Sequence, residues 1–311
     1  MKAKSLGARL LFIAVLAGFA AACSSAPAKS DTTTNVKNQA ADAEASGQQY
    51  FSQGRYELAL QFFTQALDAN GSVDNVEGVI RSRTAIGQVY LATGRLQAAQ
   101  DILTAAREQA RMRSATLFID ASISLGELYL REDDPQKSLN IFQETVFAPQ
   151  VKLTPMQTGV LYHDIGAAWK ASGDLAKALD WLSKALQNNL ANKLMEPAAA
   201  DYYMIASVHS KEGDFAAASA SAEQGLALDK KIENSSGIAK DLYAIALIAA
   251  KKGDTPTAYD YYQRAYSVFT SMGDTEGMKK SLTQLVSIAQ SLGRDEEAQG
   301  YQKALAKAGV P

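Results

Sequence analysis

Glycine residues recur along most of this 311-residue chain at a nearly constant interval, which limits the possible folds more than any other feature. The marked positions, one of them an aspartate, are Gly54, Gly94, Asp133, Gly173, Gly213, Gly253 and Gly293. Successive steps between them are 40, 39, 40, 40, 40 and 40 residues. A fixed period of this length indicates a repeat architecture, in which similar units stack on one another instead of enclosing one central core.

The residues around each marker follow a helical pattern. Apolar residues return at intervals of three and four on both sides of the glycine, as in IGAAWKASGDLAKALDWLSKAL around Gly173. Each unit is therefore predicted to be two amphipathic helices joined by a tight turn. Glycine suits this turn because it adopts a left-handed backbone at low cost. An aspartate that can cap the next helix follows three of the glycines: Asp174, Asp214 and Asp254.

Each unit also repeats an order of small and large residues. A glycine in the first helix is followed three residues later by an aromatic residue, as in Gly126 and Tyr129, and the second helix carries a small residue such as Ala178. One turn after that small residue stands a large apolar one: Phe63, Leu103, Phe142, Leu182 and Tyr262. Small residues let two helices approach, and large ones fill the space beside the contact.

This order resembles the tetratricopeptide repeat, over residues 39–311. The resemblance implies an all-α fold, a right-handed superhelix (α-solenoid) of about seven helix pairs. The common repeat has a period of about 34 residues, so the six extra residues here should lengthen the helices by about 9 Å per repeat. Similar long periods occur in kinesin light chains and Pins-type scaffolds, which bind peptides. HEAT and armadillo repeats also have periods near 40 but lack this order of small and large residues.

The first residues have the layout of a bacterial export signal. Residues 1–22 begin with basic residues and continue with an apolar run from Leu10 to Ala22, which is too short to span a membrane. The only cysteine, Cys23, follows at once, and this arrangement resembles a lipoprotein signal peptide, in which the cysteine becomes the lipid-modified first residue. Residues 23–38 are then predicted to be the lipidated cysteine and a flexible polar tether.

The same resemblance implies a location. Ser24 follows the cysteine, where lipoproteins retained at the inner membrane typically have aspartate, so we expect a lipid anchor in the outer membrane with the chain facing the periplasm. Ala20 and Ala22 also fit ordinary signal cleavage. A secreted, soluble protein without a lipid is therefore the alternative.

The composition offers little for catalysis. One cysteine and two histidines are too few for a zinc or iron–sulfur site, and a net charge of −2 does not favour nucleic acid, so no metal, cofactor or nucleic-acid partner is expected. No phosphate-binding or dinucleotide-binding motif is present. His163 and Asp164 are the one fragment of a polar cluster, but adjacent residues of a helix point about 100° apart. We expect that the chain is not an enzyme.

The inner wall of such a superhelix is where a ligand is expected. In tetratricopeptide proteins the first helix of each pair lines this groove, and residues at recurring positions near the centre are predicted to form it: His163, Tyr203, Met204, Tyr243 and Leu247. Aromatic and methionine side chains suit an extended peptide. The alternative is that Tyr203 and Tyr243 only pack neighbouring repeats together. Lys170, Lys211 and Lys251 recur near the ends of the same helices and suit acidic groups on a ligand.

These observations predict a non-enzymatic scaffold that binds a protein or peptide segment in its groove. The lipoprotein resemblance places it at the cell envelope, where it would assist the assembly or regulation of an envelope complex. A regulatory or activating subunit of an envelope enzyme is the alternative. The chain is expected to be a monomer, although the open ends of a superhelix also permit self-assembly.

Overall fold

The computed structural model describes residues 32–148 and 152–308, and this part of the chain contains α-helices and no β-strand. The helices of the first half are α1 (Thr32–Ser52), α2 (Tyr56–Ser72), α3 (Val76–Ala92), α4 (Leu96–Arg111), α5 (Ala115–Arg131), α6 (Pro135–Val146) and α7 (Pro155–Ser172). Those of the second half are α8 (Leu175–Ala191), α9 (Met195–Glu212), α10 (Phe215–Lys231), α11 (Ser235–Lys252), α12 (Thr255–Met272), α13 (Thr275–Ser291) and α14 (Asp295–Ala308). The prediction of about seven helix pairs is confirmed.

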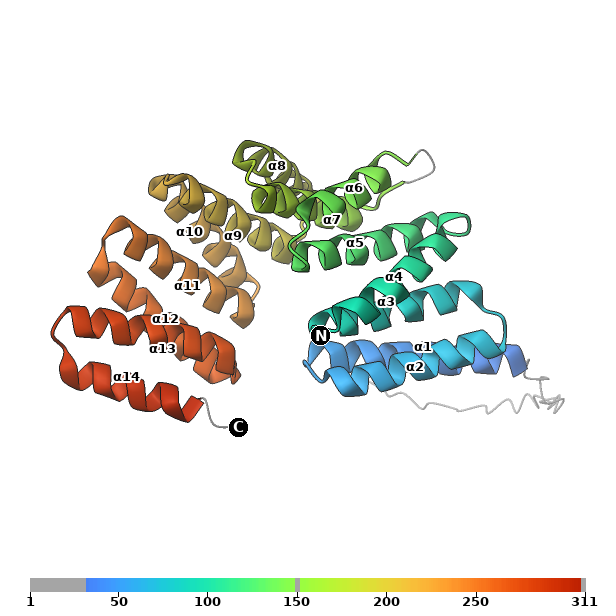
Figure 1. Cartoon of the computed structure of the whole chain (residues 1–311), viewed down its shortest axis with the longest axis horizontal. Helices are drawn as coiled ribbons and strands as arrows, with labels where there is room; N and C mark the ends of the chain where they lie inside the picture. The colour runs from blue at the N-terminus through green and yellow to red at the C-terminus, as the bar shows by residue number, and fades with distance from the viewer. Residues whose placement is uncertain (1–31, 149–151, 309–311) are drawn as a thin grey trace, which may run out of the picture.

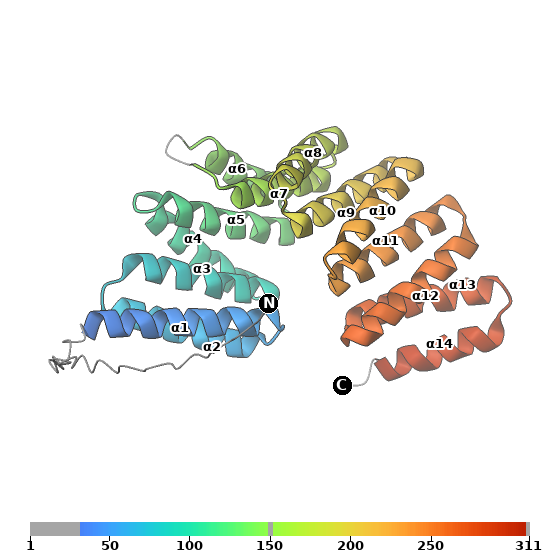
Figure 2. The same cartoon turned by 180° about the vertical axis from the view of Figure 1, so that it is seen from behind.

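The pairs follow one another around an open arc, with α1 and α2 at one end and α13 and α14 at the other (Figure 1). Each helix packs against the next, and the first helices from α1 to α11 also pack against one another. The second helices of the described pairs make no comparable contact with each other. Elements on the inside of a curve lie closer together, so the first helices form the inner wall, and Figure 2 shows the same arc from behind.

The turns inside the pairs have the predicted conformation. Gly94 has φ +72° and Gly173 has φ +93°, and Asp133, which replaces glycine in the third pair, also has a positive φ of 59°. The carboxylate of Asp174 accepts a hydrogen bond from the backbone N–H of Lys177 at the start of α8. Asp214 and Asp254 cap α10 and α12 in the same way. The turn and the cap are thus both confirmed.

The small residues of the first helices are required by large residues of the second. A Cβ placed on Gly126 would lie 2.1 Å from Cε1 of Phe142, far inside contact distance. The same holds for Gly87 against Leu103, where the distance would be 2.4 Å. Large and small residues are therefore matched across each pair, as the sequence pattern predicts.

The hydrophobic core runs along the arc instead of lying at one centre. A typical buried cluster joins Ala59 and Phe63 of α2 to Ile86 and Val89 of the next pair. Similar clusters of buried residues follow one another to the last pairs. Each pair is thus stabilised by its neighbours, as expected of a solenoid.

The N-terminal segment differs from the prediction in one respect. Cys23 lies outside the described residues, but α1 begins at Thr32, inside the stretch expected to be a tether. Val36 is half-buried and Ala40 and Ala43 are buried, so these three residues lie on one packed face of α1. The helix therefore extends into the stretch expected to be a tether. Within residues 32–148 and 152–308, no helix has the length and apolar character needed to cross a membrane.

Candidate functional site

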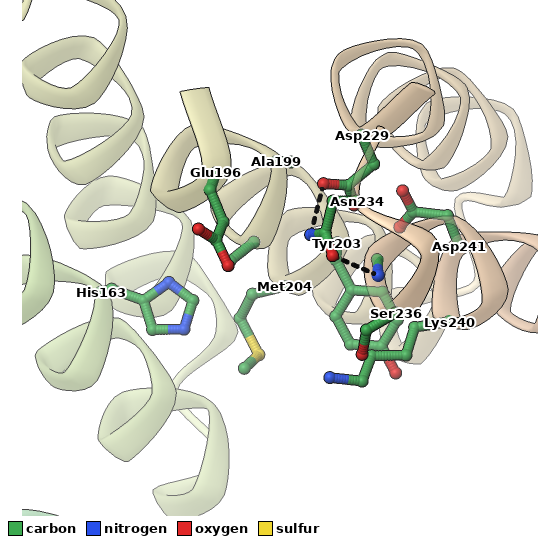
Figure 3. A pocket seen from close by; sticks show the side chains of 12 residues that line it. His163, Glu196, Ala199, Tyr203, Met204, Asp229, Asn234, Ser236, Lys240 and Asp241 are labelled. Carbon is green, nitrogen blue, oxygen red and sulfur yellow. Dashed lines mark hydrogen bonds between the residues drawn. The ribbon is translucent and has the colours of Figure 1, made fainter. Parts of the chain in front are cut away.

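A pocket opens on the inner wall near the middle of the arc, where α7, α9 and α11 meet. Its volume is about 260 Å³. We call it the central pocket, and its lining residues are His163, Glu196, Ala199, Ala200, Tyr203, Met204, Asp229, Asn234, Ser236, Gly237, Lys240 and Asp241. Figure 3 shows His163 on one side, the residues of α9 in the middle and the residues at the start of α11 opposite. The pocket thus draws on three consecutive pairs and exists only in the stacked chain.

On the α7 side, an imidazole is held by a buried carboxylate. His163 Nδ1 lies 2.7 Å from Oδ1 of Asp201 on α9, and Asn189 Nδ2 donates to the other carboxylate oxygen at 2.7 Å. Burial by itself lowers the pKa of His163, but the hydrogen bond to Asp201 and the nearby carboxylates of Asp164 and Asp201 outweigh it and raise the pKa above its usual value. The ring is therefore a fixed donor that favours the charged form.

On the α11 side, two carboxyl groups face each other. Asp229, at the end of α10, accepts a hydrogen bond from Asn234 Nδ2 at 2.9 Å. Asp241 is only 1% exposed, and its Oδ2 has no hydrogen-bond partner among the described residues. Burial, and then the charge of Asp229 and its hydrogen bond, raise the pKa of Asp241 to about 8. At neutral pH the two groups therefore share one proton and together carry a single negative charge.

The two carboxyl groups are fixed in place by the surrounding backbone. A Cβ on Gly237 would lie 1.8 Å from Oδ2 of Asp229, so only glycine fits beside this carboxylate. Asn234 already caps α11 by accepting a hydrogen bond from Gly237 N at 3.2 Å. Asp229 and Asp241 are thus not needed as helix caps, and helix capping does not explain their burial.

A group of three lysines, which we call the lysine cluster, lies towards the other ends of the same helices. Lys170 Nζ donates to Ser207 Oγ at 2.6 Å and lies 3.4 Å from Sδ of Met204, which lines the central pocket. Lys211 Nζ donates to the carbonyl oxygen of Lys170 at 3.3 Å, and Lys251 Nζ to Ser210 Oγ at the same distance.

The lysine cluster carries unbalanced positive charge. Burial first, and then the charges of Lys211 and Lys251, lower the pKa of Lys170. None of the ion pairs in the described part of the chain involves any of the three ammonium groups. The inner wall is therefore negative near the start of α11 and positive near its end.

The predicted groove residues fall into two groups. His163, Tyr203 and Met204 line the central pocket together. Tyr243 does not line it, and its ring packs edge to face on the buried ring of Tyr262 with a centroid distance of 5.2 Å. Leu247 is 37% exposed on α11 and is likewise not part of the lining. Whether the lining residues bind a ligand stays a prediction, as does lipidation of Cys23, which lies outside the described residues.

The carboxylates of the site are absent from the sequence prediction. His163 bonds to Asp201, 38 residues further on, and not to its neighbour Asp164. Asp201 and Asp241 stand 40 residues apart, one repeat period, and both are almost completely buried. This repetition of a charged residue on the first helices is the signal that marks them. Within the described residues no group of three or more His, Cys, Asp or Glu side chains is arranged to hold a metal ion.

Comparison with known families agrees with the geometry. Sequence models described as "Tetratricopeptide repeat" match residues 39–112 and 202–232. The chain contains tetratricopeptide repeats in both of its halves. No protein with a curated function matches its sequence.

Several solved structures share the architecture of this repeat protein. The apo form of the quorum sensor NprR from B. thuringiensis has a TM-score of 0.69 and 16% identity, over 90% of this chain and 80% of the other. A Rap protein complexed with Competence and Sporulation Factor has a TM-score of 0.66 and 14% identity, over 90% and 79%. The Rap conjugation gene regulator of plasmid pLS20, in complex with the Phr* peptide, has 0.62 and 14%, over 94% and 80%. At these identities the likeness shows the fold.

Proposed function

We propose that this tetratricopeptide repeat protein is a non-catalytic, lipid-anchored scaffold of the bacterial cell envelope that binds a polypeptide segment on its inner wall. The observation that carries the proposal is the central pocket. It combines the half-buried side chains of Tyr203 and Met204 with polar groups that have fixed positions, such as His163. Apolar surface with a few oriented polar groups is typical of a binding site.

The architecture of the similar structures supports a polypeptide ligand. One Rap protein is complexed with Competence and Sporulation Factor and another with the Phr* peptide, and both resemble nine-tenths or more of this chain. An inner wall built from consecutive first helices offers a long concave surface, which suits an extended segment better than a compact small molecule.

The arrangement around His163 supports binding over catalysis. Its Nδ1 is occupied by Asp201, which would orient the ring for proton transfer. Among the described residues, however, no serine or cysteine side chain forms a hydrogen bond with the other ring nitrogen. An oriented imidazole without a nucleophile is suited to donate a hydrogen bond to a ligand carbonyl or carboxylate.

The anchor rests on the N-terminal sequence. The export signal of residues 1–22 followed by Cys23 and Ser24 supports lipidation and an outer-membrane location facing the periplasm. Anchoring would raise the local concentration of the binding surface near envelope complexes whose assembly or regulation it assists. A Cys23→Ala variant is expected to leave the membrane fraction, and retention of this variant in membranes would contradict the anchor.

The binding function is tested by crosslinking in intact cells, followed by affinity purification and mass spectrometry. We expect one envelope polypeptide to be enriched with the wild-type chain and lost with Tyr203→Ala/Met204→Ala. The matched control is Tyr266→Ala, which removes a half-buried tyrosine from α12, a second helix. A partner that persists in the double variant, with helicity unchanged by circular dichroism, would place binding elsewhere. Absence of any enriched partner would contradict the proposal.

A further inference from the structure

The proposed function leaves the buried acid pair unexplained. Asp229 and Asp241 face each other at one side of the central pocket, as Figure 3 shows. One oxygen of Asp241 has no donor although the residue is 99% buried, and a buried acceptor without a donor is unfavourable. A nearby cation would balance the negative charge that this buried carboxyl pair carries.

No side chain of residues 32–148 and 152–308 forms an ion pair with either carboxyl of the acid pair. Lys240 also lines the pocket, and its charge acts to lower the pKa of both Asp229 and Asp241, but no ion pair joins it to either carboxyl in the described part of the chain. Glu196, also in the lining, opposes the charge of Lys240. The pocket therefore keeps about one negative charge from the acid pair, which one ammonium or guanidinium group would balance.

The charge along the inner wall fixes where such a group can bind. Lys251 stands 10 residues after Asp241 on α11, which is about 15 Å along the helix axis. The lysine cluster at that end would repel a cation, whereas the acid pair attracts it. An extended segment of about five residues spans this distance. A short peptide is therefore long enough to reach both the acid pair and the lysine cluster.

We infer that the Asp229–Asp241 pair is a recognition site for a positively charged group, an α-amine or a Lys or Arg side chain, on the bound polypeptide. The cation donates hydrogen bonds to the carboxyl groups with which Asp229 and Asp241 line the central pocket. This inference rests on the proposed function, because the group belongs to the segment held on the inner wall. It adds the chemical class of the ligand and the end of the groove at which its charge lies.

Three libraries of random synthetic hexapeptides test the inference on the purified full chain. The first is N-acetylated and contains no Lys or Arg, the second has a free amino terminus and no Lys or Arg, and the third is N-acetylated and includes both. Peptides retained by the immobilised protein are counted by mass spectrometry. We expect the second or third library to be enriched about tenfold or more over the first, since a charge-assisted hydrogen bond in a buried site is worth at least that factor.

Variants assign this preference to the acid pair. Asp229→Asn/Asp241→Asn keeps both side-chain shapes and removes the single negative charge of the pair, so it is expected to bring the three libraries close to parity. Asp120→Asn is the matched control, because Asp120 is a half-buried carboxylate bonded to Gln157 in another pocket of the same wall, and it should keep the preference. Thermal unfolding of each variant confirms that it is folded.

The outcomes separate the inference from the proposed function. Enrichment of the second library alone identifies an α-amine, and of the third alone a side-chain cation. Equal retention of all three libraries, lost in Tyr203→Ala, would overturn the inference and leave peptide binding intact. Retention of none by the wild-type chain would overturn both.

Discussion

Single residues in the turns differ in the strain that they bear. The turns within pairs place glycine at positive φ, except for Asp133 in the third pair, whereas three of the turns between pairs place Asp74, Lys193 and Glu233 there, with φ between 50° and 58°. A left-handed conformation costs a residue with a side chain about 1–2 kcal/mol. These positions therefore retain strain that the glycine positions have removed.

Exchanging the two kinds of residue should change stability in opposite directions. Nothing lies within 4 Å of a Cβ at Gly94, so Gly94→Ala is expected to cost about 1 kcal/mol through the backbone alone. Glu233→Gly should gain about 0.5 kcal/mol, because relief of strain exceeds the entropy lost by glycine on folding. Urea denaturation of both variants measures this, and a loss of stability in Glu233→Gly would contradict it.

The acid pair makes stability depend on pH. The pKa of Asp241 is raised to about 8 in the folded chain from an ordinary value of 3.8, so the folded state holds a proton that the unfolded state releases. The stability that Asp241 contributes by holding this proton is complete below pH 3.8 and is lost as the pH rises through 8. As the pH is raised from 5 to 8, the free energy of unfolding should fall in both proteins, and it should fall by on the order of 2 kcal/mol less in Asp241→Asn than in the wild-type chain. Parallel pH profiles would contradict this.

At the scale of helices, the pairing of small and large residues determines how closely two helices pack. Gly126→Ala should destabilise by about 2 kcal/mol, because the new methyl group collides with the ring of Phe142 in a full core. Gly300→Ala in α14 is the matched control, since nothing lies within 4 Å of its Cβ. It should stabilise by about 0.5 kcal/mol through helix propensity. Equal effects at both glycines, measured by thermal unfolding, would contradict the packing argument.

The sequence predicts most helices because each repeat has the same order of small and large residues around its turn. The markers at Gly94 and Asp133 and the contact of Gly126 with Phe142 all follow from spacing. The early end of α6 at Val146 does not follow from the period, although Pro149, which cannot donate a backbone hydrogen bond, stands shortly after it.

The site was harder to predict than the helices. Its bonds join helices far apart in sequence, such as His163 with Asp201. Aspartate is ordinarily exposed, so a buried role for Asp241 contradicts the usual pattern. Tyr203 was identifiable because its position repeats on the inner wall, but the equivalent Tyr243 packs against Tyr262 since a large ring stands opposite it.

At the scale of the whole molecule, stability should decrease towards the end of the arc. Pairs inside the solenoid pack on two neighbours, whereas α14 has only Ala298 buried. Hydrogen exchange by mass spectrometry is therefore expected to be faster in α14 than in α9, which buries seven residues. Equal protection of these two helices would show that the stack unfolds as one cooperative unit.

The inner wall of the open arc is the surface on which we propose that a polypeptide segment binds. The most direct test is the dissociation constant of the captured segment, made as a synthetic peptide, for the wild-type chain and for Tyr203→Ala/Met204→Ala. If the central pocket binds the segment, the variant should bind about tenfold more weakly or worse, because two large side chains of the contact are removed. An unchanged dissociation constant, with the variant fully helical, would contradict the account.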